Sequence, residues 1–278
     1  MDGQAPGAID RWRQQLEGWA IPETILAAAP ESPWGFPVGL FRSRARRAGE
    51  RPPTPSTLEA ARHLPEGGTV LDVGAGGGAA SLPLAGTAGR LVGVDAEADM
   101  VASFLAAAEA AGVPAEGVEG TWPEVAGRVG PADVVVCHHV LYNVADLEPF
   151  ARALTDHARR RVVVELTDRH PLVGLGPLWR RFHHLARPSG PDADDAVAAC
   201  EALGLAVDRQ DWEQQDRFGF DDFDELVAFT RRRLCLPARR DPEVAEALLE
   251  QGTHQVDGVW VSGQPRRLTT LSWPGSAG

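Results

Sequence analysis

Short apolar runs alternate with segments of helical periodicity from residue 69 onward. The runs that predict strands are Thr69–Val73, Leu91–Val94, 115–119, Asp133–Cys137, Arg161–Leu166 and Leu205–Trp212. The segments that predict helices between them are 78–86, Glu97–Ala111, Asp146–His157 and Asp192–Leu203. Strands and helices that alternate in this way predict a parallel sheet covered by helices on both faces.

The first 55 residues differ from this repeat. Apolar residues recur at helical spacing over 8–18, and a stretch rich in proline, glycine and aromatic residues follows. We therefore expect residues 1–55 to form a helical and irregular extension, which is a candidate lid. Ser56 is the expected N-cap of the next helix, because Glu59 follows it at the spacing of a capping box.

The alternation also loosens after residue 167. Helical insertions are expected near 168–190 and 220–253. Arg267–Trp273 is extended, and because the arginines at its start need no burial, we expect it to form an antiparallel strand at an edge of the sheet. The pattern as a whole predicts one Rossmann-like domain over 56–278 that carries these insertions.

Length and composition place the chain among globular proteins. Its 278 residues suffice for one α/β domain with extra helices. The longest apolar stretches fall short of the roughly 20 residues that a membrane span needs, and the start of the chain resembles no signal peptide. Three scattered cysteines favour a reducing compartment, so a cytoplasmic location is expected.

The net charge and the absence of lysine exclude several classes of function. The formal net charge of −12 argues against duplex nucleic acid as the main partner. All 27 basic residues are arginines, which excludes an enzyme Schiff base on lysine and a P-loop lysine. A basic run comprises Arg42, Arg44, Arg46, Arg47 and Arg51. It could contact an anionic substrate or RNA, although a solvated helix face explains such a run equally simply.

The most informative stretch is the turn after the first predicted strand. Val70–Val73 leads into glycines at positions 74, 76, 77 and 78, and a helix is expected to follow. Glycine lets the backbone approach a ligand closely and adopt positive φ. A Gly-x-Gly turn alone does not identify the ligand, because many nucleotide-binding folds contain one.

Two aspartates indicate which groups of a ligand could lie near the turn. Asp72 precedes the first glycine by two residues, so a pyrophosphate at the turn would meet a like charge, at a cost of several kcal/mol at ~4 Å. The ammonium and sulfonium groups of S-adenosylmethionine would instead suit a carboxylate there. Asp95 ends the second predicted strand, where a carboxylate can accept hydrogen bonds from both ribose hydroxyls.

Asp72-Val-Gly74-Ala-Gly76-Gly-Gly78, Asp95 and Cys137-His138-His139-Val140-Leu141 together resemble the class I S-adenosylmethionine-dependent methyltransferases. The resemblance covers about residues 56–210. It implies a seven-stranded, mostly parallel sheet with the last strand antiparallel, and S-adenosylmethionine as cofactor. It also implies that Asp72 and the glycines surround the methionine end and that Asp95 holds the ribose. Thr121 or Trp122 stands where the family often places an acidic or polar residue against the adenine.

The two histidines after the fourth predicted strand are candidates for chemistry rather than for metal binding. Successive strand residues point to opposite faces, so Cys137, His138 and His139 do not converge on one ion, and no metal is expected. We expect His138 on the cofactor side and His139 on the substrate side. His139 and Glu165 are the candidate catalytic residues, with His170 as a further candidate base by position.

Aromatic residues outside the core repeat are candidates for the substrate cleft. Tyr142 follows the fourth predicted strand. Trp34, Phe36, Trp179 and His183 lie in the expected extension and insertion, where a lid would form. Each of these side chains could equally serve only in packing.

These observations favour a methyltransferase that acts on a small molecule by in-line displacement. An RNA methyltransferase that uses the arginine run is one alternative, although the family's Asn/Asp-Pro-Pro-Tyr motif is absent. An NAD-dependent oxidoreductase is another, because Gly74, Gly76 and Ala79 pass as a dinucleotide turn. A cofactor-binding protein without catalysis is a third. The pattern leaves the acceptor and the oligomeric state open.

Overall fold

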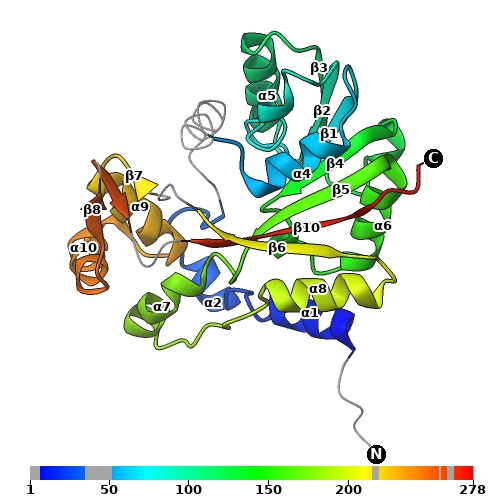
Figure 1. The fold of residues 1–278 in the computed structure, drawn as a ribbon. Coiled ribbons are helices and arrows are strands. Elements are labelled where there is room, and N and C mark those ends of the chain that lie inside the picture. The colour runs from blue at the N-terminus through cyan, green and yellow to red at the C-terminus, as the bar shows by residue number, and fades with distance from the viewer. Residues whose placement is uncertain (1–6, 35–51, 215–218, 257, 262–265, 278) are drawn as a thin grey trace, which may run out of the picture.

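A seven-stranded sheet forms the centre of the protein (Figure 1). The computed structural model describes residues 7–34, 52–214, 219–256, 258–261 and 266–277. The sheet order is β3-β2-β1-β4-β5-β10-β6, with only β10 antiparallel to its neighbours. Its strands are β1 (Thr69–Val73), β2 (Arg90–Asp95), β3 (Ala115–Glu119), β4 (Ala132–His138), β5 (Ala158–Thr167), β6 (Asp208–Glu213) and β10 (Arg267–Pro274). The predicted Rossmann-like fold is confirmed.

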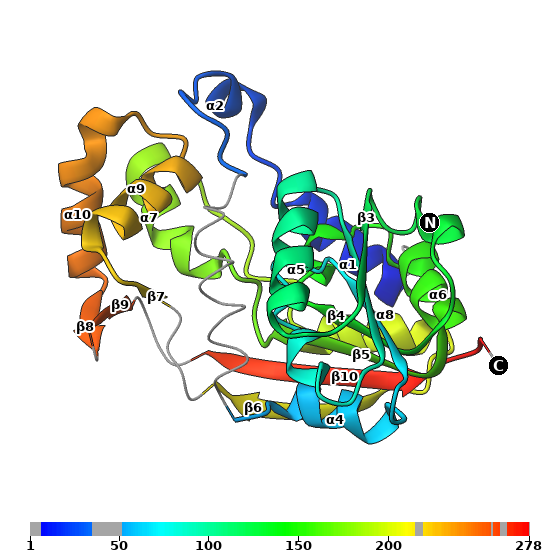
Figure 2. The same ribbon diagram turned by 90° about the horizontal axis from the view of Figure 1, so that it is seen from above.

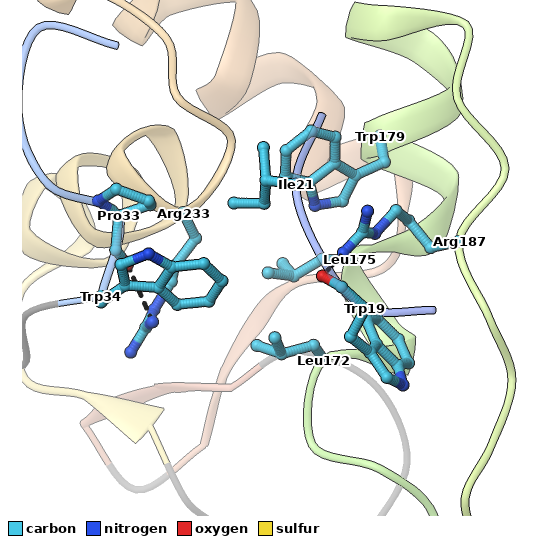
Figure 3. Close-up of a pocket in the computed structure, with 9 residues that line it drawn as sticks. All are labelled: Trp19, Ile21, Pro33, Trp34, Leu172, Leu175, Trp179, Arg187 and Arg233. Atoms are coloured by element: carbon cyan, nitrogen blue, oxygen red, sulfur yellow. Dashed lines mark hydrogen bonds between the residues drawn. The ribbon is translucent and has the colours of Figure 1, made fainter. Parts of the chain in front are cut away.

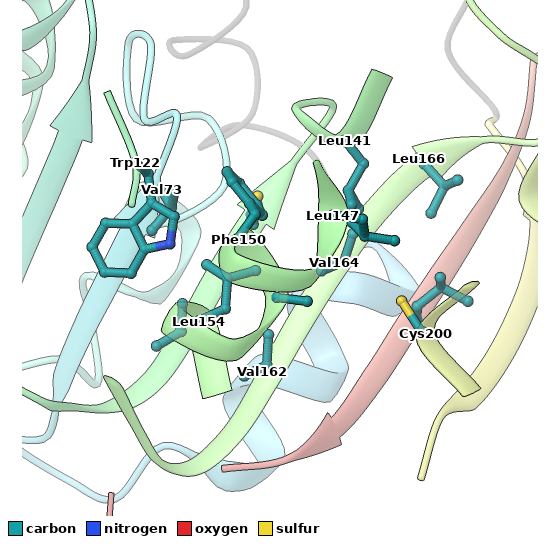
Figure 4. Close-up of a cluster of buried hydrophobic side chains, with 14 of the residues drawn as sticks. Val73, Trp122, Leu141, Leu147, Phe150, Leu154, Val162, Val164, Leu166 and Cys200 are labelled. Atoms are coloured by element: carbon teal, nitrogen blue, oxygen red, sulfur yellow. The ribbon is translucent and has the colours of Figure 1, made fainter. Parts of the chain in front are cut away.

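Helices cover both faces of the sheet, because the central strands are apolar on both sides. In β4, Val134 and Val136 face one layer, whereas Val135 and Cys137 face the other. The first layer contains α4 (Pro55–His63) and α5 (Ala98–Ala110), and the second contains α6 (Leu147–His157) and α8 (Ala193–Ala202), with α1 (Ala8–Glu17) beside α8. Figure 4 shows how α6 fills the second layer with Leu147, Phe150 and Leu154.

The segments between and beyond these elements build a smaller lobe with its own hydrophobic core (Figure 2). It comprises α7 (Gly176–His183), α9 (Phe223–Arg233), α10 (Asp241–Glu250) and a three-stranded sheet of β7 (Gly219–Phe220), β9 (Val259–Val261) and β8 (His254–Val256). The chain enters the lobe after β5 and β6 and leaves it before β10. Because β10 is antiparallel, all three connections lie at the edge where the parallel strands end.

The described part of the extension before α4 contacts both the large sheet's helical layer and the small lobe. Trp12 of α1 is fully buried, and its Nε1 donates to the carbonyl of Val144 at 2.8 Å. In contrast, α2 (Glu23–Ala27) contributes Ile25 to the core of the lobe. The described part of residues 1–55 therefore connects the sheet layer with the lobe through these two helices. Among the described helices, none is long and apolar enough to span a membrane.

Three local expectations were wrong. Thr54, rather than Ser56, caps α4, because its hydroxyl accepts from the Thr57 N–H at 3.2 Å. Residues 78–86 form turns and a single 3-10 turn, η1 (Leu82–Leu84), because glycine and proline interrupt the segment. Strand β10 is not at an edge; it lies between β5 and β6, with Leu268, Leu271 and Trp273 buried.

Candidate cofactor and catalytic site

The glycine turn after β1 has a conformation that other residues would strain. Gly74, Gly76 and Gly78 have φ values of +74°, +52° and +86°. The N–H groups of Gly74 and Ala75 donate to the carbonyl of Val94 in β2, at 2.8 and 3.0 Å. A Cβ on Gly74 would lie 2.3 Å from Cγ2 of Val140, so the turn approaches the segment after β4 closely.

Asp95 is fixed to this turn. Its Oδ2 accepts from the Gly76 N–H at 2.8 Å, and its Oδ1 accepts from the Glu97 N–H at 3.1 Å. The side chain is half-buried, and each oxygen keeps a second lone pair for a ligand. The carboxylate that the sequence assigns to the ribose is therefore held at a set position beside the turn.

Asp72 lies below the turn rather than at its surface. Its side chain is fully buried, and its Oδ2 accepts from the Ser81 hydroxyl at 2.6 Å. Its Oδ1 has no hydrogen-bond partner among the described residues. Burial raises the pKa of Asp72 to about 7, and nearby Asp95 adds to the rise. Sequence reasoning expects Asp72 close to the methionine end of the ligand, and that role stays a prediction.

The raised pKa of Asp72 makes stability depend on pH. The native carboxyl holds its proton up to about pH 7 and the unfolded one only to about 3.8, so the native state binds more protons in between. The free energy of unfolding is therefore expected to fall by about 2 kcal/mol from pH 5 to pH 7 because of this group. Urea unfolding of Asp72→Asn and of the unmodified protein tests this. Equal pH slopes in the two proteins would contradict it.

Residues after β3 lie beside Asp95. The N–H of Gly120 donates to the carbonyl of Asp95 at 2.9 Å, which brings Thr121 near the turn with its side chain exposed. Trp122 does not face this edge. It is 6% exposed, and its ring contacts that of His157 edge-on, with centroids 4.9 Å apart, inside the layer under α6. Neither assignment to the adenine is tested by these contacts, and of the two side chains only that of Thr121 is exposed.

His138, His139 and Glu165 meet where β4 and β5 end. Nε2 of His139 lies 3.1 Å from Oε1 of Glu165, and Nδ1 of His138 lies 3.9 Å from Oε2. The backbone N–H of His139 also donates to the Glu165 carbonyl at 2.7 Å. Among the described residues, no three side chains gather as metal ligands. The arrangement is a carboxylate that orients an imidazole.

Electrostatics keeps this carboxylate charged. Burial would raise the pKa of Glu165, but His138 and hydrogen bonds from His139 and Ser56 outweigh it and hold the pKa well below its usual range. Burial lowers the pKa of His138, and the charge of Glu165 opposes that shift. Sequence reasoning missed the contribution of Ser56, because its pattern is that of an N-cap.

The backbone of His139 is left-handed, with φ at +61°. A non-glycine residue rarely adopts this region, and such strain persists where the surroundings impose it, often at functional sites. Here the turn points the imidazole back onto Glu165. The buried Nδ1 of His139 has no hydrogen-bond partner among the described residues.

The remaining substrate candidates divide into two groups. Tyr142 is buried, and its hydroxyl bonds that of Thr167 at 2.6 Å. His183 donates from Nε2 to the Leu234 carbonyl at 2.6 Å. Hydrogen bonds thus occupy both side chains within the protein. Trp34 and Trp179 line a pocket instead. Phe36 and the arginine run from 42 to 51 lie outside the described residues.

Comparison with known proteins agrees with this geometry. Residues 70–161 match a family described as a methyltransferase domain. A ribosomal protein L11 methyltransferase from Thermus thermophilus is 31% identical over 59% of this chain. A ubiquinone biosynthesis O-methyltransferase from a Methylobacterium species is 37% identical over 30% of this chain. The chain spans 66% of the first relative and 34% of the second.

A solved structure extends the likeness in fold to almost the whole chain. The cyclopropane-fatty-acyl-phospholipid synthase-like protein from Lactobacillus casei superposes with a TM-score of 0.52 at 15% identity. The alignment covers 94% of this chain and 99% of that protein. The strand order, the glycine turn with Asp95 and the matched methyltransferase domain lead to one assignment. The chain belongs to the class I S-adenosylmethionine-dependent methyltransferases.

Proposed function

We propose that this protein transfers a methyl group from S-adenosylmethionine to a small molecule by in-line displacement. The observation that carries the proposal is the hydrogen bond from the Gly76 N–H to Asp95 at 2.8 Å. It joins the glycine turn and the ribose-binding carboxylate into one preformed unit. Preformed sites position reactants without an ordering cost at each turnover.

The residues at this edge suit the proposed cofactor. The turn offers backbone without side chains, Asp95 offers acceptors for ribose hydroxyls, and Thr121 is exposed near Asp95. The cofactor supplies a methyl group on a sulfonium, which is already a strong electrophile. The η1 segment is too short to provide the helix N-terminus that favours a pyrophosphate. This weakens the case for NAD at the same turn.

His139 and Glu165 are proposed to handle the acceptor's proton. With Nε2–H donated to Glu165, Nδ1 of His139 carries the lone pair that can accept a proton from a hydroxyl or amine. Glu165 fixes the tautomer and stabilises the imidazolium that forms. His138 lies on the other side of Glu165, towards which its Nδ1 points from 3.9 Å.

The lobe supports a small acceptor. It lies over the edge where β5 and β6 end, which is the edge at which open α/β sheets bind their ligands. The Thermus relative is named for a ribosomal protein, so a protein acceptor is the second candidate. A screen that finds transfer to ribosomal proteins and to no small molecule would favour it.

Calorimetric titration of S-adenosylmethionine tests the proposed function. Asp95→Ala is expected to weaken binding by about 100-fold, because it removes the ribose acceptors and releases the Gly76 N–H. Asp99→Ala is the matched control, since Asp99 is an exposed acid on the neighbouring helix α5. Absence of binding to the unmodified protein, once bound cofactor has been removed, would overturn the proposal.

A further inference from the structure

A row of buried polar side chains crosses the sheet beside the candidate catalytic residues. Strand register places His138 of β4 opposite Glu165 of β5, and Glu165 opposite Thr270 of β10. Ser56 lies in the first turn of α4, which packs against β5 and β10. Glu165, Thr270 and Ser56 are only 7%, 3% and 0% exposed. Polar groups buried this deeply are costly unless they are hydrogen-bonded, so each of them needs a partner.

Three hydrogen bonds join this row to β6. Nε1 of Trp212 in β6 donates to Oγ1 of Thr270 at 3.0 Å. Oγ1 of Thr270 lies 2.7 Å from Oγ of Ser56, and the hydroxyl of Ser56 bonds the carboxylate of Glu165. The four side chains come from four different elements and form one continuous chain of hydrogen bonds that ends on Glu165.

The direction of each bond in this chain is fixed from both ends. The indole N–H of Trp212 can only donate, and an ionised carboxylate can only accept. The Ser56 hydroxyl therefore gives its one hydrogen to Glu165 and must accept from Thr270, which in turn accepts from Trp212. Aligned hydrogen bonds strengthen one another, and donors that point at a carboxylate favour its charged form.

The hydroxyl of Ser56 is not needed to hold α4 in place. Glu59 of the same helix accepts from Nε of Arg161 in β5 and from Oγ of Ser272 in β10, each at 3.1 Å. These bonds attach α4 to both strands without Ser56, and another residue caps the helix. The bond from Ser56 to Glu165 therefore acts on the carboxylate rather than on the helix.

Titratable and charged groups approach Glu165 from its other sides. His138 and His139 act on it from the end of β4, Tyr142 from η3 (Leu141–Asn143), and Arg266 from the residue before β10. The chain of hydrogen bonds reaches Glu165 from the side of α4 and β10. Unlike the imidazoles, the serine and threonine hydroxyls stay neutral donors throughout the ordinary pH range, so the support that they give does not depend on pH.

We propose that Ser56 and Thr270 are positioning residues, which hold Glu165 as an ionised acceptor and so keep Nε2–H of His139 directed at it. Neither residue is assigned a contact with the cofactor or the acceptor. With Nε2–H fixed in this way, Nδ1 is the atom of His139 that is left to accept a proton. That this arrangement serves catalysis rests on the proposed function, whereas the chain and its direction do not.

A double-mutant cycle, measured by urea unfolding at neutral pH, tests the bond to ionised Glu165. Ser56→Ala is expected to lower the folding equilibrium constant about five- to tenfold more in the unmodified protein than in Glu165→Gln. The reason is that a hydrogen bond to a charged group is stronger than one to a neutral amide. Additive effects of Ser56→Ala and Glu165→Gln would overturn the inference.

Thr269→Val is the matched control for this cycle. Thr269 is buried in the same strand, but it faces the other side of the sheet, where its hydroxyl donates to Asp211 at 2.8 Å. Its effect is therefore expected to add to that of Glu165→Gln. Thr270→Val covers the case in which Ser56→Ala fails to fold, because valine has nearly the shape of threonine. It is expected to couple to Glu165→Gln in the same direction, and additivity would again contradict the inference.

Kinetic measurements separate positioning from packing. Ser56→Ala and Thr270→Val are each expected to lower kcat by about tenfold and to change the affinity for S-adenosylmethionine by less than about threefold. Thr270→Ser keeps the hydroxyl and is expected to retain kcat within about threefold. None of the four residues of the chain lines the small pocket drawn in Figure 3, so these variants leave that pocket intact. An equal loss of kcat in Thr270→Ser and Thr270→Val, or an unchanged kcat in Ser56→Ala, would refute the positioning role.

The two measurements keep this inference apart from the proposed function. Coupling of Ser56 to Glu165 in a protein that binds no S-adenosylmethionine refutes only the methyltransferase function. Binding of the cofactor without this coupling refutes the inference alone.

Discussion

Gly74→Ala is expected to abolish measurable binding of S-adenosylmethionine and to lower the free energy of unfolding by about 3 kcal/mol. The added Cβ would lie 2.3 Å from Cγ2 of Val140, so either the turn or the segment after β4 must move. The left-handed backbone at φ +74° adds strain that alanine tolerates poorly. Calorimetric titration and urea unfolding measure the two effects.

Two further variants separate the causes. Gly86→Ala is the control, because a Cβ there meets no atom within 4 Å. Val140→Ala in the Gly74→Ala background removes the clashing Cγ2, so it is expected to recover part of the stability while the strain of the positive φ remains. If Gly74→Ala bound the cofactor within about threefold of the unmodified protein, the close approach of turn and ligand would be refuted.

His139→Asn is expected to lower kcat by about 10²- to 10⁴-fold, the usual contribution of a general base. Asparagine tolerates the left-handed backbone at φ +61°, so the change removes the imidazole with little added strain. The affinity for S-adenosylmethionine is expected to change by less than about threefold, because His139 is assigned to the acceptor side. Transfer of a labelled methyl group to an acceptor found by screening small hydroxylated and amino compounds provides the rate.

His184→Asn is the matched control for this experiment. His184 is also left-handed, with φ at +54°, but it is exposed at the end of α7. Glu165→Gln is expected to lower kcat less than His139→Asn, since it weakens the orientation of the base but leaves the base in place. A kcat for His139→Asn above about a third of the unmodified value would show that the reaction needs no base at this position.

The parallel part of the sheet was predictable because its signal is local. Each central strand is a short apolar run, and its burial on both faces follows from helices on either side. The glycines of the turn were predictable for the same reason, since a positive φ excludes most other residues. Asp95 could be placed because it ends a recognisable strand.

Features that depend on distant partners were not predictable. The neighbours of β10 belong to segments far from it in the chain, and local periodicity does not identify them. Thr121 and Trp122 are adjacent in sequence, yet one is exposed and the other lies in the core under α6. The position of Trp122 after the third predicted strand suggested a ligand contact, but its burial depends on partners such as His157, which lie far along the chain.

Contacts within the small lobe were also not predictable from the sequence. Its sheet pairs Phe220 with Trp260, two residues in strands too short to be recognised individually. His183 looked chemically useful, but a backbone carbonyl from α9's end occupies its Nε2. The contacts of Arg187 were not predictable either, because the rings beside its guanidinium come from Trp19 and Trp179 in other segments.

The interior position of β10 has a consequence for biosynthesis. A nascent chain that lacks residues 267–274 leaves one edge of β5 unpaired and β6 without a neighbour. Open strand edges are the sites at which chains associate wrongly, so the emerging protein is exposed to aggregation until this strand inserts. A stop codon shortly before Arg267 would therefore remove the middle of a sheet rather than trim its end, and would yield a chain that depends on chaperones.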